Sequence, residues 1–138
     1  MARITFSGRQ LLKLAKKFEK DLLNEISDVV QETARLIQTE AKALAPVDDG
    51  SLRDSIEMKM IGKYNAEVTV GAGYAIWVEF GTGIYAENGK GRKTSWTYFS
   101  TKLGRYVTTD GMKAQPFWGP AVDNGRDYFM KEMRRLGL

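Results

Sequence analysis

The 138-residue sequence predicts an α+β fold in a single domain spanning residues 1–138. Three observations support this prediction. Apolar residues recur every three or four positions near the N-terminus, they do so again near the C-terminus, and apolar and polar residues alternate in four short segments between. The expected architecture is a long N-terminal helix, an antiparallel sheet of two hairpins, a short middle helix and a C-terminal helix.

Residues 9–44 are expected to form one long helix, with Ser7 as its N-cap and Pro46 just beyond its end. Its apolar stripe consists of Leu11, Leu14, Ala15, Phe18, Leu22, Ile26, Val29, Ala34, Ile37, Ala41 and Leu44. At 1.5 Å per residue this helix is roughly 50 Å long, which is more than a domain of this size can cover. The helix therefore either kinks near residues 20–24 or projects one end to meet another subunit.

The middle of the chain is expected to hold a β-hairpin and a short helix. Apolar and polar residues alternate at 56–60 and at 66–70, and Gly-Lys-Tyr-Asn at 62–65 is a turn sequence. Residues 74–80 are mostly apolar and suit either a buried strand or two helical turns. We interpret them as a helix because Gly81 follows directly and would serve as its C-cap.

The segment 84–113 holds the whole excess of positive charge, since it has six basic and two acidic residues in a chain of net charge +4. A second hairpin is expected here, with strands at 95–100 and 105–108. We expect the segment to protrude from the domain as a basic arm. Its candidate interaction residues are Lys90, Arg92, Lys93, Lys102 and Arg105. Beyond the arm, Pro120 marks the start of the final helix.

The composition argues against catalysis. The chain has no cysteine and no histidine, so it lacks the commonest general base and the commonest metal ligand. A divalent metal would need carboxylates to converge, and the acidic residues near turns are Asp48, Asp49, Asp54 and Glu79. Their spacing matches no metal-binding loop, so turn and capping roles are favoured. We predict no catalytic, cofactor-binding or metal-binding residue; a small metal-dependent hydrolase is kept as an unfavoured alternative.

Glu79 is unusual because it lies inside an apolar run. A buried carboxylate needs a cation or several hydrogen-bond donors. Arg53 is the predicted partner, in an ion pair that links the turn near residue 50 to the 74–80 segment. The alternative is an exposed Glu79 on the outer face of a short helix.

The basic arm also contains the aromatic residues Trp96, Tyr98, Phe99 and Tyr106. Aromatic rings among cations are typical of platforms that bind single-stranded nucleic acid. Alternating aromatics in a hairpin are more often packing residues, with the cations as a solvated flank. A nucleic-acid-binding module is therefore a second functional alternative, and its mark would be an affinity that falls with rising salt.

Three short phrases are the most specific feature of the sequence: APVDDGSLRDSI at 45–56, YAIWVEFGT at 74–82 and AQPFWGPA at 114–121. In their order and spacing they resemble the tail-completion, head–tail joining or neck proteins of long-tailed bacteriophages and prophages. The residues that carry the resemblance are Asp48, Gly50, Leu52, Arg53, Tyr74, Glu79, Phe80, Gly81, Pro116 and Phe117. The resemblance covers about residues 10–135, although Asp49 stands where many members carry Thr.

What the resemblance implies is a structural virion protein without enzymatic activity or a cofactor. Such proteins form a ring at the head-proximal end of the phage tail and join the tail to the connector below the capsid. The implied partners are further copies of this chain and the neighbouring connector and tail proteins, with non-specific contact to phage DNA. No membrane partner is expected. The implied location is the head–tail junction of the virion, after synthesis in the cytoplasm of the bacterial host.

Overall fold

The computed structural model describes residues 8–48 and 50–138, and its α+β class confirms the prediction. In chain order the elements are α1 (Gly8–Leu44), α2 (Ser51–Asp54), β1 (Ile56–Met60), β2 (Ala66–Val70), α3 (Ala75–Phe80), the 3₁₀ turn η1 (Gly83–Tyr85), β3 (Trp96–Ser100), β4 (Arg105–Thr109) and α4 (Trp118–Arg135). The predicted N-cap Ser7 and the candidate metal ligand Asp49 lie outside the described residues.

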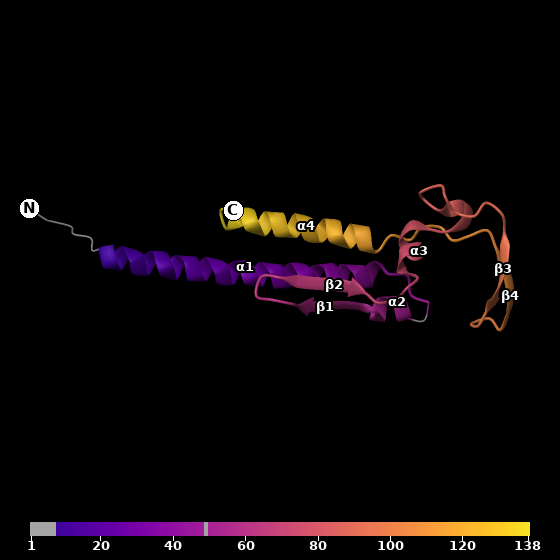
Figure 1. The fold of residues 1–138 in the computed structure, drawn as a ribbon, viewed down its shortest axis with the longest axis horizontal. Coiled ribbons are helices and arrows are strands. Elements are labelled where there is room, and N and C mark those ends of the chain that lie inside the picture. Colours follow the sequence, from indigo (N-terminus) through magenta and orange to yellow (C-terminus); the bar gives the residue numbers. More distant parts are fainter. Residues whose placement is uncertain (1–7, 49) are drawn as a thin grey trace, which may run out of the picture.

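Helix α1 runs unbroken for 37 residues. It does not kink near residues 20–24, and its N-terminal end instead extends past the end of α4 (Figure 1). Residues 8–21 are all exposed, and burial begins only at Leu22. Of the two arrangements expected for an overlong helix, the projecting end is therefore the one observed.

Helix α4 lies antiparallel beside the rest of α1 (Figure 1). Two polar contacts mark the ends of this pairing: Asn124 Nδ2 donates to Glu40 Oε2 at 2.7 Å, and Arg135 lies 3.8 Å from Glu25. Between them Gly125 lets the helices approach closely, since a Cβ atom there would overlap the side chain of Ile37. The missing side chain therefore sets the spacing of the two helices.

The hairpin β1–β2 packs on the C-terminal half of α1. Its register pairs Ile56 with Val70, so the alternation read from the sequence places Ile56 in the core. Two side chains of α1 hold it: Gln38 donates to the carbonyl of Ile56 at 3.2 Å, and Ser27 donates to the carbonyl of Lys63 in the turn at 2.6 Å.

The hydrophobic core is small and lies where the three phrases meet. Its buried members are Ala41, Ala45, Leu52, Ile56, Val78, Phe117 and Ala121. All but Ala41 come from the phrases at 45–56, 74–82 and 114–121. The phrases are thus distant in sequence but adjacent in space.

The strands β3 and β4 form a hairpin of their own, which does not pair with β1–β2. The two predicted hairpins therefore make two separate two-stranded sheets. Figure 1 shows β3–β4 standing apart at one end of the elongated molecule, opposite the free end of α1. We use the term "body" for α1, α2, β1, β2, α3 and α4, and "arm" for the predicted segment 84–113.

Candidate functional site

The carboxylate of Glu79 caps the N-terminus of α4. Its Oε2 accepts hydrogen bonds from the backbone N–H groups of Phe117 at 2.8 Å and Trp118 at 2.9 Å, and its Oε1 accepts one from Gly119 at 2.8 Å. The first four N–H groups of a helix have no partner within it. Three of them are satisfied by Glu79, and Pro120 at the fourth position has no N–H to satisfy. The partial positive charge of the helix terminus adds to the stabilisation of the carboxylate.

The predicted ion pair between Glu79 and Arg53 is wrong. Glu79 is buried, with 9% of its surface exposed, but its partners are the three N–H groups of α4. Arg53 instead contacts Asp54, with Nε 3.2 Å from Oδ1. The sequence analysis allowed for a cation or several hydrogen-bond donors but named only a cation. The donors are N–H groups at a helix N-terminus that lies 38 to 40 residues further along the chain.

The candidate metal ligands do not converge among the described residues. Asp48 pairs with Lys102, Asp54 pairs with Arg53, and Glu79 is enclosed beneath α4. Within residues 8–48 and 50–138, no group of three acidic side chains could hold a metal ion.

The other residues singled out from the phrases have several roles. Leu52 and Phe117 belong to the core. Gly50 and Gly81 adopt φ angles of 86° and 78°, a left-handed region that favours glycine. Two further members, Phe80 and Pro116, are exposed, and Tyr74 and Asp48 face a cleft at the foot of the arm.

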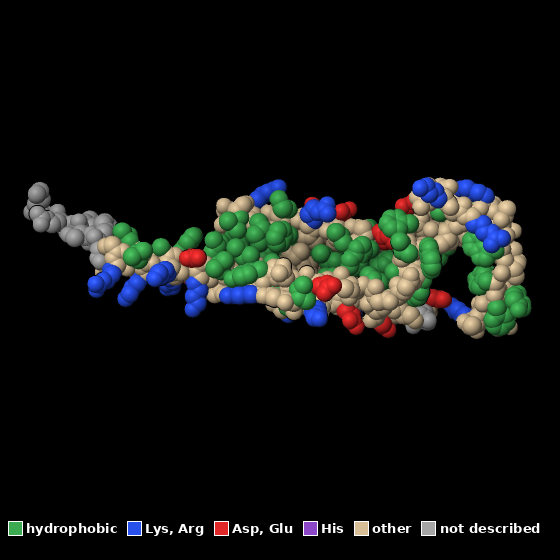
Figure 2. Space-filling view, viewed as in Figure 1, with side chains coloured by type: hydrophobic (Ala, Val, Ile, Leu, Met, Phe, Trp, Pro, Cys, Tyr) green, Lys and Arg blue, Asp and Glu red, His purple; other side chains and the backbone are tan. Residues whose placement is uncertain are grey.

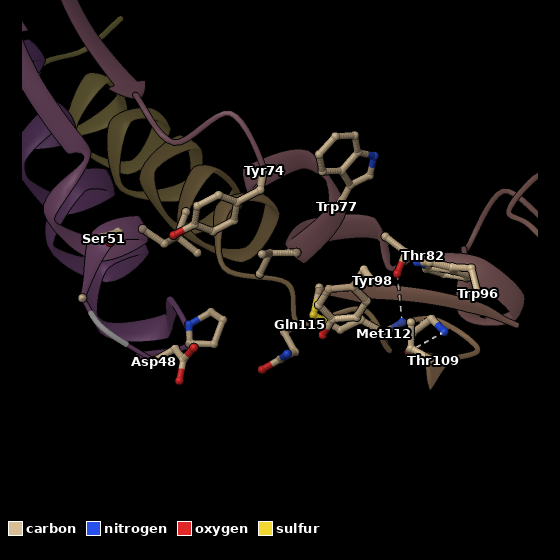
Figure 3. A pocket seen from close by; sticks show the side chains of 15 residues that line it. Asp48, Ser51, Tyr74, Trp77, Thr82, Trp96, Tyr98, Thr109, Met112 and Gln115 are labelled. Carbon is tan, nitrogen blue, oxygen red and sulfur yellow. Dashed lines mark hydrogen bonds between the residues drawn. The ribbon is translucent and has the colours of Figure 1, made fainter. Parts of the chain in front are cut away.

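A cleft of about 970 Å³ separates the arm from the body. Its aromatic lining comes from both sides: Tyr74 and Trp77 lie before and within α3, whereas Trp96 and Tyr98 lie on β3 (Figure 3). Met112 and Gln115 line it from the segment that leads into α4. We call this the arm cleft. The sequence singled out Tyr74, Trp96 and Tyr98 separately but not the cleft that they share, since the period-2 spacing of Trp96 and Tyr98 shows only that they share one face of a strand.

The tip of the arm folds back towards the body. Lys102, in the turn between β3 and β4, forms an ion pair with Asp48, which lies between α1 and α2. Figure 2 shows an open gap between the arm and the body, with a basic and an acidic side chain at one edge of it. Both partners are largely exposed, so this ion pair contributes little to stability.

The arm joins the body through glycines in backbone contact. A Cβ atom on Gly83 would overlap the carbonyl oxygen of Asp110, and one on Gly111 would overlap that of Thr82. Backbone hydrogen bonds cross here as well, from Thr82 to Met112 at 2.9 Å and from Ile84 to Asp110 at 3.1 Å. The two ends of the arm therefore meet at its base.

The cations of the arm do not form one patch. Arg92 lies over the ring of Trp96, 5.6 Å from its centroid, and Lys102 is engaged with Asp48. Lys90, Lys93 and Arg105 are exposed. The aromatics are divided as well, because Phe99 and Tyr106 pack edge to face with each other at 5.3 Å, while Trp96 and Tyr98 line the arm cleft. The mixed cation–aromatic platform suggested by the sequence is thus split between different faces of the hairpin.

The projecting end of α1 is amphipathic. Leu11, Leu14 and Phe18 are spaced three and four apart, so they share one face, and 54–71% of each side chain is exposed. The opposite face is basic and carries Arg9, Lys13, Lys16, Lys17 and Lys20. Figure 2 shows these two kinds of side chain on opposite sides of the projecting helix. Among the described helices, none has an apolar stretch that could cross a membrane.

Comparison with known proteins finds a family whose sequence model matches this chain. The sequence model of the family described as "Bacteriophage HK97-gp10, putative tail-component" matches residues 9–81, which is more than half of the chain. The match runs from α1 to Gly81 and ends where the arm begins, so it includes the first two phrases almost entirely. No curated protein and no solved structure matches. The resemblance to a phage tail family that the sequence predicted is confirmed.

Proposed function

Because the chain belongs to the HK97-gp10-like family of phage tail components, we propose that it is a tail-completion or head–tail joining subunit. Copies of it form a ring at the head-proximal end of the tail. The ring contacts the connector on one side and the tail on the other. Its role is structural, in the virion and not in catalysis.

The observation that carries the proposal is apolar surface left uncovered at both ends of an elongated molecule. At one end lie Leu14 and Phe18 of α1, and at the other end lie Trp77 and Tyr98 of the arm cleft, all of them about half or more exposed. Large exposed apolar patches on a soluble protein mark interaction sites. As a monomer such a chain leaves much apolar surface exposed to solvent, and assembly would cover that surface.

The shape also favours a ring over a pairwise dimer. The two uncovered surfaces differ, since one is a helix and the other a cleft, and they lie at opposite ends of the body. A contact between unlike surfaces leaves one of each free on every dimer, so further copies add, and they close into a ring where the rotation between neighbours permits it. This is the symmetry expected of a ring around the tail axis.

The test is complementation of a phage that lacks this gene. Charge reversal at Lys90, Arg92 and Lys93 should reduce the yield of joined virions, so that free heads and free tails accumulate. The purified variant should stay folded. Reversal of Lys59 and Lys63, which lie on the other hairpin, is the matched control and should leave joining intact. Normal virions from the deleted phage, or absence of the protein from purified particles, would refute the proposal.

Contact between the arm and phage DNA is a finer part of the same proposal. The exposed Lys90, Lys93 and Arg105 would contact phosphates without reading sequence. Binding of the purified protein to DNA should then weaken steeply as salt rises. An affinity that does not depend on salt would assign the arm to protein contacts alone.

A further inference from the structure

We infer that the arm cleft of each subunit receives the projecting end of α1 from a second copy of this chain. The inference rests on the proposed ring and specifies which surfaces meet in it. The inserted element is residues 8–21, with its apolar face turned into the cleft. The resulting contact is head-to-tail and the same between every pair of neighbours.

The projecting end of α1 has the properties expected of a helix that inserts into a partner. Residues 8–21 are helical from Gly8 onward, although no other part of the described chain covers them. Their apolar stripe continues the face that α4 covers further along α1, since Leu11, Phe18 and Val29 are spaced by seven and eleven residues. An amphipathic helix with one apolar face is the usual ligand of an apolar groove.

The lining of the cleft is suited to bind the apolar face of a helix. It presents aromatic rings on both walls, and Tyr74, Trp77 and Tyr98 are 43–57% exposed despite their size. Aromatic side chains of this kind provide most of the binding energy where they are buried against a partner. A neighbour's Leu11, Leu14 and Phe18 would cover the rings and would be covered in turn.

The charges of the two surfaces are complementary. Residues 8–21 carry five basic and two acidic side chains. Among the described residues that line the cleft, the only charged one is acidic: Asp48. Figure 2 shows acidic side chains along the edge of the body beside the arm.

The ion pair between Lys102 and Asp48 spans the open side of the cleft and is exposed. It can therefore open without disturbing the core. When the pair forms again, the tip of the arm would lie over an inserted helix. The helix would then be in contact with α3, β3 and the tip of the arm.

The test uses engineered cysteines, because the chain has none of its own. One variant carries Leu11→Cys on the apolar face of the helix end and Gln115→Cys at the cleft, and a short bis-maleimide joins cysteines that lie close. We expect a ladder of covalent oligomers beyond the dimer, in concentrated protein or in purified particles. The matched control carries Lys13→Cys with Gln115→Cys. Lys13 lies two residues along on the opposite face, so its ladder should be at least tenfold weaker.

Three results would overturn the inference. They are an equal ladder from the Lys13 control, no ladder in either preparation, or dimers from Leu11→Cys alone without longer species, which would show self-pairing of the helix ends. The outcome is separable from that of the proposed function. A double-cysteine variant that joins heads to tails but gives no ladder would refute the contact and leave the ring role standing, whereas normal virions without the gene would refute the role itself.

Discussion

Glu79 Oε1 accepts a hydrogen bond from the N–H of Gly119 at 2.8 Å, and a Cβ atom on Gly119 would lie only 2.9 Å from that same oxygen. The carboxylate and the first turn of α4 are therefore fitted to each other. Through this contact the second phrase of the sequence fixes the place of the third, and α4 in turn covers α1.

Replacement of Glu79 by Ala should lower the free energy of unfolding by about 3 kcal/mol or more, because it leaves three N–H groups at the start of α4 without acceptors. Glu79→Gln should cost less, about 1–2 kcal/mol, since one oxygen remains to accept. Denaturant unfolding followed by circular dichroism measures both. The control Glu57→Ala, at an exposed position of β1, should change the value by less than about 0.5 kcal/mol. Equal effects at the two glutamates would contradict the capping role.

Gly119→Ala should cost about 1–3 kcal/mol, because the added methyl group pushes the carboxylate of Glu79 away from its donors. The same change made in the Glu79→Ala protein should cost nothing and should stabilise by up to about 1 kcal/mol, since the clash is gone and Ala favours a helix over Gly. Gly73→Ala, where nothing lies within 4 Å of a built Cβ, is the control. Additive losses in the double variant would show that Gly119 acts independently of Glu79.

Gly125→Ala tests the close approach of α4 to α1. In the native protein the methyl group meets the side chain of Ile37, and the overpacking should outweigh the roughly 1 kcal/mol by which Ala favours a helix over Gly. In an Ile37→Ala background the sign should reverse, and Gly125→Ala should stabilise by about 1 kcal/mol. Thermal unfolding of the four proteins in this cycle measures the coupling. An unchanged sign would mean that the helices separate to admit the methyl group.

Removal of residues 84–110, with Gly83 joined to Gly111, should leave a body that unfolds in one cooperative transition. These two glycines already lie in contact, so the junction needs no long linker. The core residues come from the body and the segments flanking the arm. Loss of the cooperative transition in calorimetry would show that the arm is part of the folding unit.

Phe18→Ser should change the free energy of unfolding by less than about 0.5 kcal/mol, because the ring is 71% exposed and loses no intramolecular packing. Val29→Ala, further along the same stripe where only 5% is exposed, should cost at least about 1 kcal/mol. Both are measured at low protein concentration, where assembly does not contribute. A large loss at Phe18 would mean that the end of α1 folds back on its own subunit.

The sequence by itself determined the elements of this protein and their order. The periods of 3.6 and 2 along α1, β1–β2 and β3–β4 are local patterns, and each records which face of an element is apolar. The charge excess of residues 84–113 and the phrase order were equally readable, and they led to the phage tail family. The overlong helix also predicted that α1 would either kink or project at one end, and the projecting end is the one observed.

Only the tertiary structure decided what each of these faces meets. Glu79 finds donors about 40 residues away because α3 ends against the start of α4, a meeting that no local pattern encodes. Trp77 and Tyr98 line the same cleft because Gly83 and Gly111 are in contact at the base of the arm. This contact places the arm beside α3. Side-chain periodicity fixes the direction in which a residue points relative to its own element, whereas partners follow from packing between elements, which depends on the whole chain at once.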